Sequence, residues 1–234
     1  PAPGGTITVK MGTDKDANIV AAESSIKLEA GGFPGSAVGA AVQCIFAAYD
    51  IPNTRIDGFD IVVNKPKSAA YRAPGSPQAA FATETVSDEL ARIHGMDPID
   101  FRLQNASKEG TRRADGVVFP KVGNVEVLEA AKKSDHWNSD LGTPAKGRVR
   151  GRGVASGYWF NVGLKSTVNL SVNSDGSVVL VEGSSDIGGT RTSISMQAAE
   201  ILGIEVENFR PSVGDTETAG YADVTGGSRT TYAT

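Results

Sequence analysis

Short stretches in which apolar and polar side chains alternate predict strands in both halves of the chain. Residues 19–29 are rich in β-branched side chains, and residues 55–64 alternate in the same manner. In the second half, two apolar runs flank the sequence Asn-Ser-Asp-Gly at residues 173–176, which is typical of a β-hairpin turn. Residues 206–213 are predicted to form one more strand.

Helices are predicted between these strands from apolar spacing and from residues that favour helix ends. One is expected over residues 40–49. A longer helix is expected to begin with a serine cap and a first-turn proline at Ser76 and Pro77, and to end at Gly95. The apolar stripe of this longer helix consists of Phe81, Val86, Leu90 and Ile93.

Three shorter helices complete the predicted pattern. One begins at Asp97 and ends near residue 103, and one runs over residues 192–202 with Gly203 as its stop. The third begins at Asn124. Its inward-facing residues are expected to be Val127, Leu128 and Ala131.

The mixed order of strands and helices indicates an α+β fold with two mixed sheet-and-helix subdomains. Residues 135–152 are polar and contain Gly142, Pro144 and several basic side chains, so they are expected to be a linker. The chain is therefore predicted to divide into residues 1–134, the linker 135–152, and residues 153–234.

Composition excludes several classes of protein. The chain has 234 residues, of which 39% are hydrophobic and 21% charged, and its net charge of -4 argues against general nucleic-acid binding. No apolar run approaches the roughly 20 residues of a membrane span, and the first residues lack the features of a signal peptide. A cytoplasmic location is therefore expected.

Cysteine and histidine are too scarce to build a metal centre. The one cysteine, Cys44, lies in an apolar run and excludes an internal disulfide or an iron–sulfur cluster, so a buried structural thiol is expected. His94 and His136 have no ligand partner at helical spacing, and no metal-ligating residue is predicted.

Residues 70–78 form the most informative stretch of the chain. Arg72 lies in a turn rich in proline and glycine, and a predicted helix follows directly. This arrangement fixes a cation and backbone N–H groups at one place, which suits an anionic, phosphate-bearing ligand.

Four blocks of sequence, in this order, resemble the molybdopterin-binding subunit of the xanthine dehydrogenase/aldehyde oxidase family. None is specific alone, but together they cover nearly the whole chain from about residue 10. The first two blocks comprise residues 49–53, 64 and 70–72, and then residues 72, 88–91, 95, 97–98 and 102–105. The other two comprise residues 175–177 and 186–192, and then residues 214–216 and 225–231.

The resemblance implies a fragment of a molybdenum-dependent hydroxylase that acts on an aldehyde or an N-heterocyclic carbon. The family's large subunit is several times longer, so this chain would span the end of the first molybdopterin-binding subdomain and the start of the second. The family's catalytic glutamate would lie beyond residue 234, and the isolated fragment is expected to be inactive. Iron–sulfur and FAD groups would lie on partner domains or subunits, and a homo-oligomer is expected. The alternative is a non-catalytic binding or assembly module that kept the family fold.

In the first half, the resemblance assigns roles to Arg72 and Pro74. Arg72 matches the family's active-site arginine near the metal and the substrate, and is the candidate catalytic and cofactor-binding residue; a surface salt bridge is the alternative. Pro74 falls where many relatives place an aromatic residue against the substrate, which makes a planar purine-type substrate less expected. Glu84, one turn into the following helix, is expected to form a salt bridge or a cap.

In the second half, the resemblance assigns two glycine-rich segments to the cofactor. Gly188, Gly189 and Thr190 would offer N–H groups to the pterin, and relatives usually have glutamine where this chain has Gly189. Gly226, Gly227 and Ser228 match the segment whose backbone approaches the molybdenum ligands. The alternatives are a helix-capping loop and an ordinary glycine-rich turn. Two neighbouring residues are expected to have supporting roles: Asp186 in ordering its own turn, and Arg229 as a phosphate or structural partner.

Overall fold

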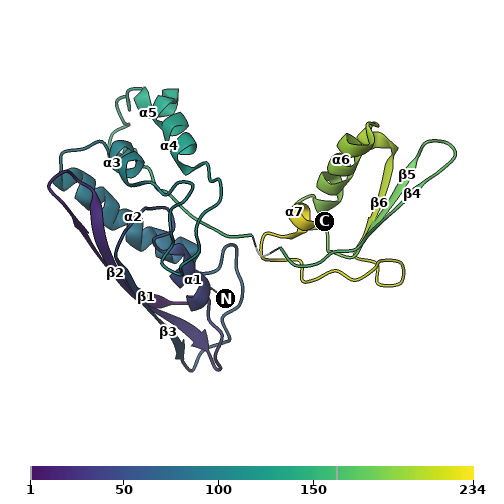
Figure 1. The fold of residues 1–234 in the computed structure, drawn as a ribbon, viewed down its shortest axis with the longest axis horizontal. Coiled ribbons are helices and arrows are strands. Elements are labelled where there is room, and N and C mark those ends of the chain that lie inside the picture. The colour runs from purple at the N-terminus through teal and green to yellow at the C-terminus, as the bar shows by residue number, and fades with distance from the viewer. Residues whose placement is uncertain (1, 162) are drawn as a thin grey trace. The chain divides into compact units, whose positions relative to one another are not determined.

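The computed structural model describes residues 2–161 and 163–234 and divides into two compact units, residues 1–159 and 160–234. Each unit combines a three-stranded sheet with helices (Figure 1), which confirms the predicted α+β class. The segment 135–152, predicted to be a linker, lies inside the first unit. Arg152 holds it there by donating hydrogen bonds to the carbonyl oxygens of Trp137 and Ser139.

The first unit is built on a sheet with strand order β1-β2-β3, in which β2 is central. The strands are β1 (Gly5–Thr13), β2 (Ile19–Gly31) and β3 (Thr54–Val62). β1 pairs antiparallel with β2, and β3 pairs parallel with it. Ile26 and Leu28 of β2 are fully buried in the core beneath the helices. The predictions of β2 and β3 are confirmed, whereas β1 was not predicted, because as an edge strand it buries its apolar side chains only in part.

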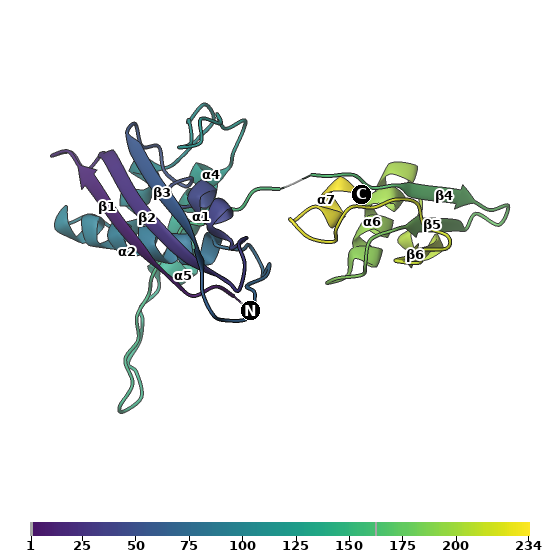
Figure 2. The same cartoon turned by 90° about the horizontal axis from the view of Figure 1, so that it is seen from below.

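Helices α1 (Val38–Cys44) and α2 (Ser76–Ile93) pack on this sheet, as Figure 2 shows. α1 is shorter than the predicted helix over residues 40–49, because the chain passes into turns and then bridges Ala106 through Tyr49. Cys44 is buried and free, as expected, and its burial raises the pKa of the thiol.

The predicted apolar stripe of α2 is wrong at Phe81 and Ile93, whereas Leu90 packs against the core. Phe81 is 79% exposed and Ile93 is 72% exposed. The buried face consists mainly of small residues: Ala79, Thr83, Ser87 and Ala91. Small side chains let α2 approach its neighbours closely, and a Cβ at Gly75 would lie 2.6 Å from the carbonyl oxygen of Ala37. Close packing of the backbone, rather than burial of large side chains, fixes the position of this helix.

The start of α2 also differs from the prediction. Gly75 is the N-cap and provides no side-chain hydrogen bond, while Pro77 occupies the first turn as expected. The hydroxyl of Ser76 donates to the carbonyl oxygen of Tyr158 at 2.7 Å instead of capping the helix. The serine therefore ties the segment near residue 158 to the start of α2.

The remaining helices of the first unit form a layer beside α2. α3 (Pro98–Asn105) is capped by Asp97, whose carboxylate accepts from the N–H groups of Ile99 and Asp100, as the sequence predicts for its start. α4 (Asn124–Lys133) buries Leu128, but Val127 is exposed, which corrects the predicted inward face. α5 (Asp135–Asn138) follows directly.

The second unit has strand order β4-β5-β6 with one long helix packed on it. β4 (Val168–Val172) and β5 (Val178–Glu182) form the predicted hairpin, and α6 (Thr190–Leu202) ends at Gly203 as predicted. The predicted strand over residues 206–213 divides into a 3-10 turn, η1 (Val206–Asn208), and β6 (Phe209–Val213). A short helix, α7 (Thr230–Ala233), follows. Helix α6 and the sheet enclose a core that includes Val178, Leu180, Ile194 and Phe209.

In the residues that the structure describes, no helix is both long and apolar enough to cross a membrane.

The carboxylate of Asp60 on β3 holds the loop before α1. It accepts from the N–H groups of Gly35 and Ser36 at 2.6 and 2.9 Å, and hydrogen bonds from Ser36 and Gly35 lower its pKa below the ordinary 3.8. Because the pKa is lower in the folded state, the ionised carboxylate stabilises the fold at pH values above the ordinary pKa. This stabilisation is lost as the pH falls through the folded-state pKa. We therefore expect the amides of Gly35 and Ser36 to lose protection, relative to their intrinsic exchange rates, below pH 4, and already at pH 7 in Asp60→Ala.

Hydrogen exchange across this pH range checks the prediction, with Asp57→Ala on the same strand as the control. Among the described residues, Asp57 forms an ion pair only with exposed Arg55, so its removal is expected to leave the loop unchanged. Equal loop exchange in both variants would contradict the role of Asp60.

Candidate functional site

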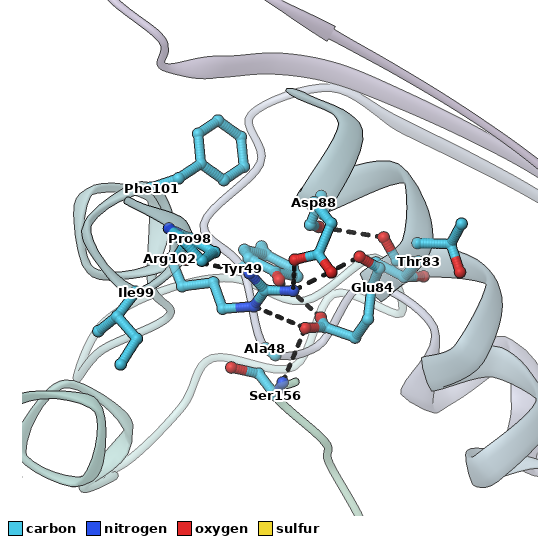
Figure 3. Close-up of polar contacts among 12 residues, drawn as sticks. Ala48, Tyr49, Thr83, Glu84, Asp88, Pro98, Ile99, Phe101, Arg102 and Ser156 are labelled. Carbon is cyan, nitrogen blue, oxygen red and sulfur yellow. Dashed lines mark hydrogen bonds and ion pairs between the residues drawn. The ribbon is translucent and has the colours of Figure 1, made fainter. Parts of the chain in front are cut away.

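A buried ion pair between Arg102 and Glu84 joins helices α2 and α3 in the first unit (Figure 3). The guanidinium Nε of Arg102 donates to Oε2 of Glu84 at 2.8 Å, and a second guanidinium nitrogen contacts Asp88 at 2.8 Å. Tyr49 donates its hydroxyl to the other Glu84 oxygen at 2.6 Å, and the backbone N–H of Ser156 donates to Oε2. Glu84 is therefore an ion-pair residue, as the sequence predicts.

The central charged groups of this cluster are buried, and the partners of Arg102 offset the effect of burial on its pKa. Arg102 is fully buried and Glu84 nearly so. Burial works to lower the pKa of Arg102, but Tyr49 and Glu84 hold that pKa above its ordinary value. Burial, and then the charge of Glu84, raise the pKa of Tyr49. The cluster joins α2 and α3 to the segments at Tyr49 and Ser156.

The turn at Arg72 presents a free cation. Arg72 is exposed, and its guanidinium has no hydrogen bond or ion pair to any residue that the structure describes. The next residues fold back tightly, since Ala73 has a φ of 50° and Gly75 a φ of 83°, and Pro74 is half-buried. The N–H of Ser76 is already bonded to the carbonyl of Ala73, and Pro77 has none. The guanidinium of Arg72, rather than backbone N–H groups, is therefore the main source of positive charge at this turn.

The second unit contains a cavity of about 490 Å³ where the two predicted cofactor segments meet. Thr190 comes from the first segment, and Gly226 and Ser228 come from the second. Gly188 and Gly189 are exposed immediately before Thr190, while Gly227 lies between the two other lining residues. Segments far apart in sequence thus form one site.

The N-terminus of α6 supplies backbone donors at this site. Gly189 is the N-cap with a φ of 88°, and it has no side chain to cap the helix. The N–H groups of Gly189, Thr190 and Thr192 have no hydrogen-bond partner among the described residues. Asp186 accepts from the N–H of Arg191 and pairs with its side chain at 3.3 Å, so it orders its own turn as expected. Unpaired N–H groups at a helix start favour an anionic ligand.

Arg229 anchors the second glycine-rich segment, residues 226–228, by hydrogen bonds. It is fully buried, and its terminal nitrogens donate to the carbonyl oxygens of Lys165, Asp223 and Val224. These bonds support the structural role among the two that the sequence left open. Its Nε is buried without a partner among the described residues, and the residue lines the cavity. A buried unpaired donor is costly, so a ligand with acceptor atoms fits this cavity.

Two lining residues, Gln197 and Tyr232, lie outside the blocks that carry the family resemblance. Gln197 lies two turns into α6 and donates from its amide to the carbonyl oxygen of Thr231 at 3.1 Å. Its position on the helix carried no sequence signal, because only the packing of α7 beside α6 brings it to the cavity. Thr231, in contrast, belongs to a block that was recognised.

Comparisons with known proteins agree on one family. Models of the molybdopterin cofactor-binding domain match residues 3–106 and 122–234. The aldehyde oxidoreductase molybdenum-binding subunit PaoC of Escherichia coli is 30% identical over 88% of this chain and 29% of its own length. The xanthine dehydrogenase molybdenum-binding subunit of Escherichia coli O157:H7 is 33% identical over 72% of this chain and 24% of its own length.

Solved structures show the same relationship. The aldehyde oxidoreductase from Desulfovibrio desulfuricans superposes with a TM-score of 0.80 at 27% identity, over 97% of this chain and 26% of that one. The chain therefore belongs to the family of molybdopterin cofactor-binding domains found in xanthine and aldehyde oxidoreductases. It spans less than a third of the length of the two Escherichia coli relatives.

Proposed function

We propose that this chain is part of a longer molybdenum hydroxylase and forms part of the cradle for its molybdenum–molybdopterin cofactor. The observation that carries the proposal is the cavity of the second unit, where Thr190 and the segment 226–228 meet. Unpaired N–H groups of α6 and the unpaired Nε of Arg229 fit the phosphate and other oxygen-bearing parts of the cofactor.

The parent enzyme is proposed to oxidise an aldehyde or an N-heterocyclic carbon. Support comes from the relatives, which are named as aldehyde oxidoreductase and xanthine dehydrogenase subunits. The electrons are proposed to leave through iron–sulfur and FAD groups on partner subunits or domains. The fragment alone is proposed to be inactive, because it supplies one side of a cofactor site and no electron acceptor.

The bound cofactor supplies the hydroxylation and redox chemistry, and the residues of this chain supply position and charge. Gly188, Gly189 and Thr190 hold an anionic group at the start of α6, and residues 226–228 let the cofactor approach the backbone. Arg72 directs its free guanidinium to negative charge that develops on the substrate, and so orients it. Pro74, two residues further on, offers no aromatic face for stacking on the substrate.

A non-catalytic binding or assembly module is the second candidate. Gly189 favours it, because this position lacks the side chain that the family resemblance leads us to expect, and a Cβ there would meet open space. Such a module would keep the fold without retaining the cofactor.

Metal analysis of the full-length parent, purified with its partner subunits, tests the two candidates. The pterin is assayed in the same sample by its fluorescent oxidation product. Stoichiometric molybdenum and pterin are expected. If both are missing in cells whose other molybdoenzymes are loaded, the hydroxylase proposal is wrong and the assembly module takes its place.

A side chain at Gly226 is expected to displace the cofactor. Gly226 lines the cavity, its φ is not in the left-handed region, and a Cβ would meet only Val224 at 3.9 Å. Gly226→Val should therefore fold normally while it fills space that the cofactor needs. We expect the molybdenum and pterin content of the purified parent to fall severalfold.

Gly151→Val is the matched control, because Gly151 is equally open but does not line this cavity. The control should retain full molybdenum and pterin. Equal content in both variants would show that residues 226–228 do not contact the cofactor.

A further inference from the structure

A groove of about 890 Å³ lies between β1 and α2, and none of the residues assigned to the cofactor or the substrate lines it. β1 contributes residues 5–9 to its wall. The helix contributes Pro77, Gln78, Phe81, Ala82, Thr85 and Val86. Phe81 is 79% exposed at this groove. A large aromatic side chain beside half-buried apolar residues marks a surface suited to contact with another chain segment.

The outer edge of β1 is open. β1 is the edge strand of its sheet, and Figure 2 shows it with only β2 beside it. The carbonyl of Gly4 accepts from the N–H of Glu29, so Gly4 and every second residue after it face β2 with their hydrogen-bonding groups. The intervening residues Ile7, Val9 and Met11 direct their N–H and C=O groups to the open edge. None of these groups has a partner among the described residues.

Gln78 gives independent support for a polar occupant of the groove in the parent protein. Its Oε1 is buried yet has no hydrogen-bond partner among the described residues, and the residue lines the groove beside Phe81. A buried acceptor without a donor costs about 1–3 kcal/mol. An added strand with a donor near Gln78 removes that cost, whereas a purely apolar ligand does not.

The length of the relatives indicates where the occupant comes from. The chain spans 24 to 29% of the length of the two Escherichia coli relatives, so most of a parent of similar length lies outside these residues. A segment of the same polypeptide is tethered to the groove, and its effective concentration exceeds that of a second copy in solution. The tether therefore favours an occupant from the same chain.

We propose that an extended segment of the parent polypeptide, outside these 234 residues, adds to the free edge of β1 as a fourth strand. Its backbone bonds Ile7, Val9 and Met11, its apolar side chains cover Phe81 and Val86, and one donor reaches Oε1 of Gln78. This inference rests on the longer parent chain of the proposed function, but it does not depend on the cofactor.

Photocross-linking of the full-length parent, purified with its partners, tests the occupant. The photoreactive p-benzoylphenylalanine replaces Phe81, and the same residue at Phe33, an exposed phenylalanine elsewhere in the first unit, is the control. We expect the Phe81 probe, but not the Phe33 probe, to capture a peptide from outside residues 1–234 without increasing the mass of the large subunit on a denaturing gel.

Four results would overturn the proposal: a doubled mass, which identifies a second copy; capture of a partner subunit; capture confined to residues 1–234; or no capture. Molybdenum content is measured on the same samples, so a failure of the cofactor assignment is seen separately. Loss of molybdenum with the expected cross-link retained would overturn the proposed function alone.

Hydrogen exchange of the unmodified parent gives a second test that needs no variant. The outward amides of Ile7 and Val9 should exchange as slowly as the inward amides of Thr6 and Thr8. Fast exchange at Ile7 and Val9, with slow exchange at Thr6 and Thr8, would show an open edge and overturn the proposal.

Discussion

Replacing Arg72 with alanine is expected to lower kcat of the parent enzyme without loss of cofactor or stability. Arg72 is exposed and has no partner among the described residues, so its removal breaks no contact of the fold. If its guanidinium stabilises charge that develops on the substrate, kcat should fall by about 10²–10³-fold, or roughly 2.7–4 kcal/mol. Steady-state kinetics on samples matched for molybdenum content measure the effect.

Arg92→Ala provides the control for this experiment. Arg92 is an exposed arginine in the last turn of α2, at the opposite end of that helix from the Arg72 turn. It carries the same charge, so its removal corrects for any general effect of net charge. Arg72→Lys should recover activity only in part, because an ammonium lacks the planar fork of a guanidinium. Unchanged kcat in Arg72→Ala would remove this residue from the active site.

Replacing Arg102 with methionine is expected to cause the largest loss of stability in the first unit. The change leaves the carboxylate of Glu84 buried with its main cationic partner gone. Breaking a buried ion pair in this way costs about 3–5 kcal/mol. It also removes the donors to Asp88 and to the carbonyl of Pro98, which lie on two different helices. Urea unfolding followed by fluorescence should show a clearly lowered midpoint.

A double-mutant cycle with Glu84→Gln separates the ion pair from general packing. Because the double variant buries no unpaired charge, it should lose less stability than the sum of the two single changes. Arg72→Ala, which removes an exposed arginine, serves as the stability control and should not shift the midpoint. Strict additivity of the two core changes would show that Arg102 and Glu84 do not act as a pair.

Local signals in the sequence were sufficient where a single segment decides its own conformation. Asp97 caps α3, Gly203 ends α6, and residues 173–176 form the hairpin turn, as predicted. Each depends on a side chain or a glycine that acts within a few residues of its own position. The family blocks indicated which segments to propose as cofactor-binding, although no spacing rule relates Gly188 to Gly226.

The buried face of α2 could not be predicted from the local sequence. Its large apolar residues at Phe81 and Ile93 predicted the buried face, but small residues such as Ala79 and Ala91 occupy that face. Periodicity reports which residues share a side of a helix, whereas the neighbours decide which side is covered. Here the sheet and α1 lie so close that only small side chains fit, and the aromatic side faces the groove.

The sequence by itself determined the α+β class, the main helices and strands, and the family, because these follow from local preferences and from blocks of residues in order. Only the tertiary structure decided that Glu84 and Arg102 meet in a buried pair, that Thr190, Gly226 and Ser228 line one cavity, and that β1 has an open edge. These features arise between segments far apart in the chain, and their formation depends on packing and on exclusion of water, which no local pattern records.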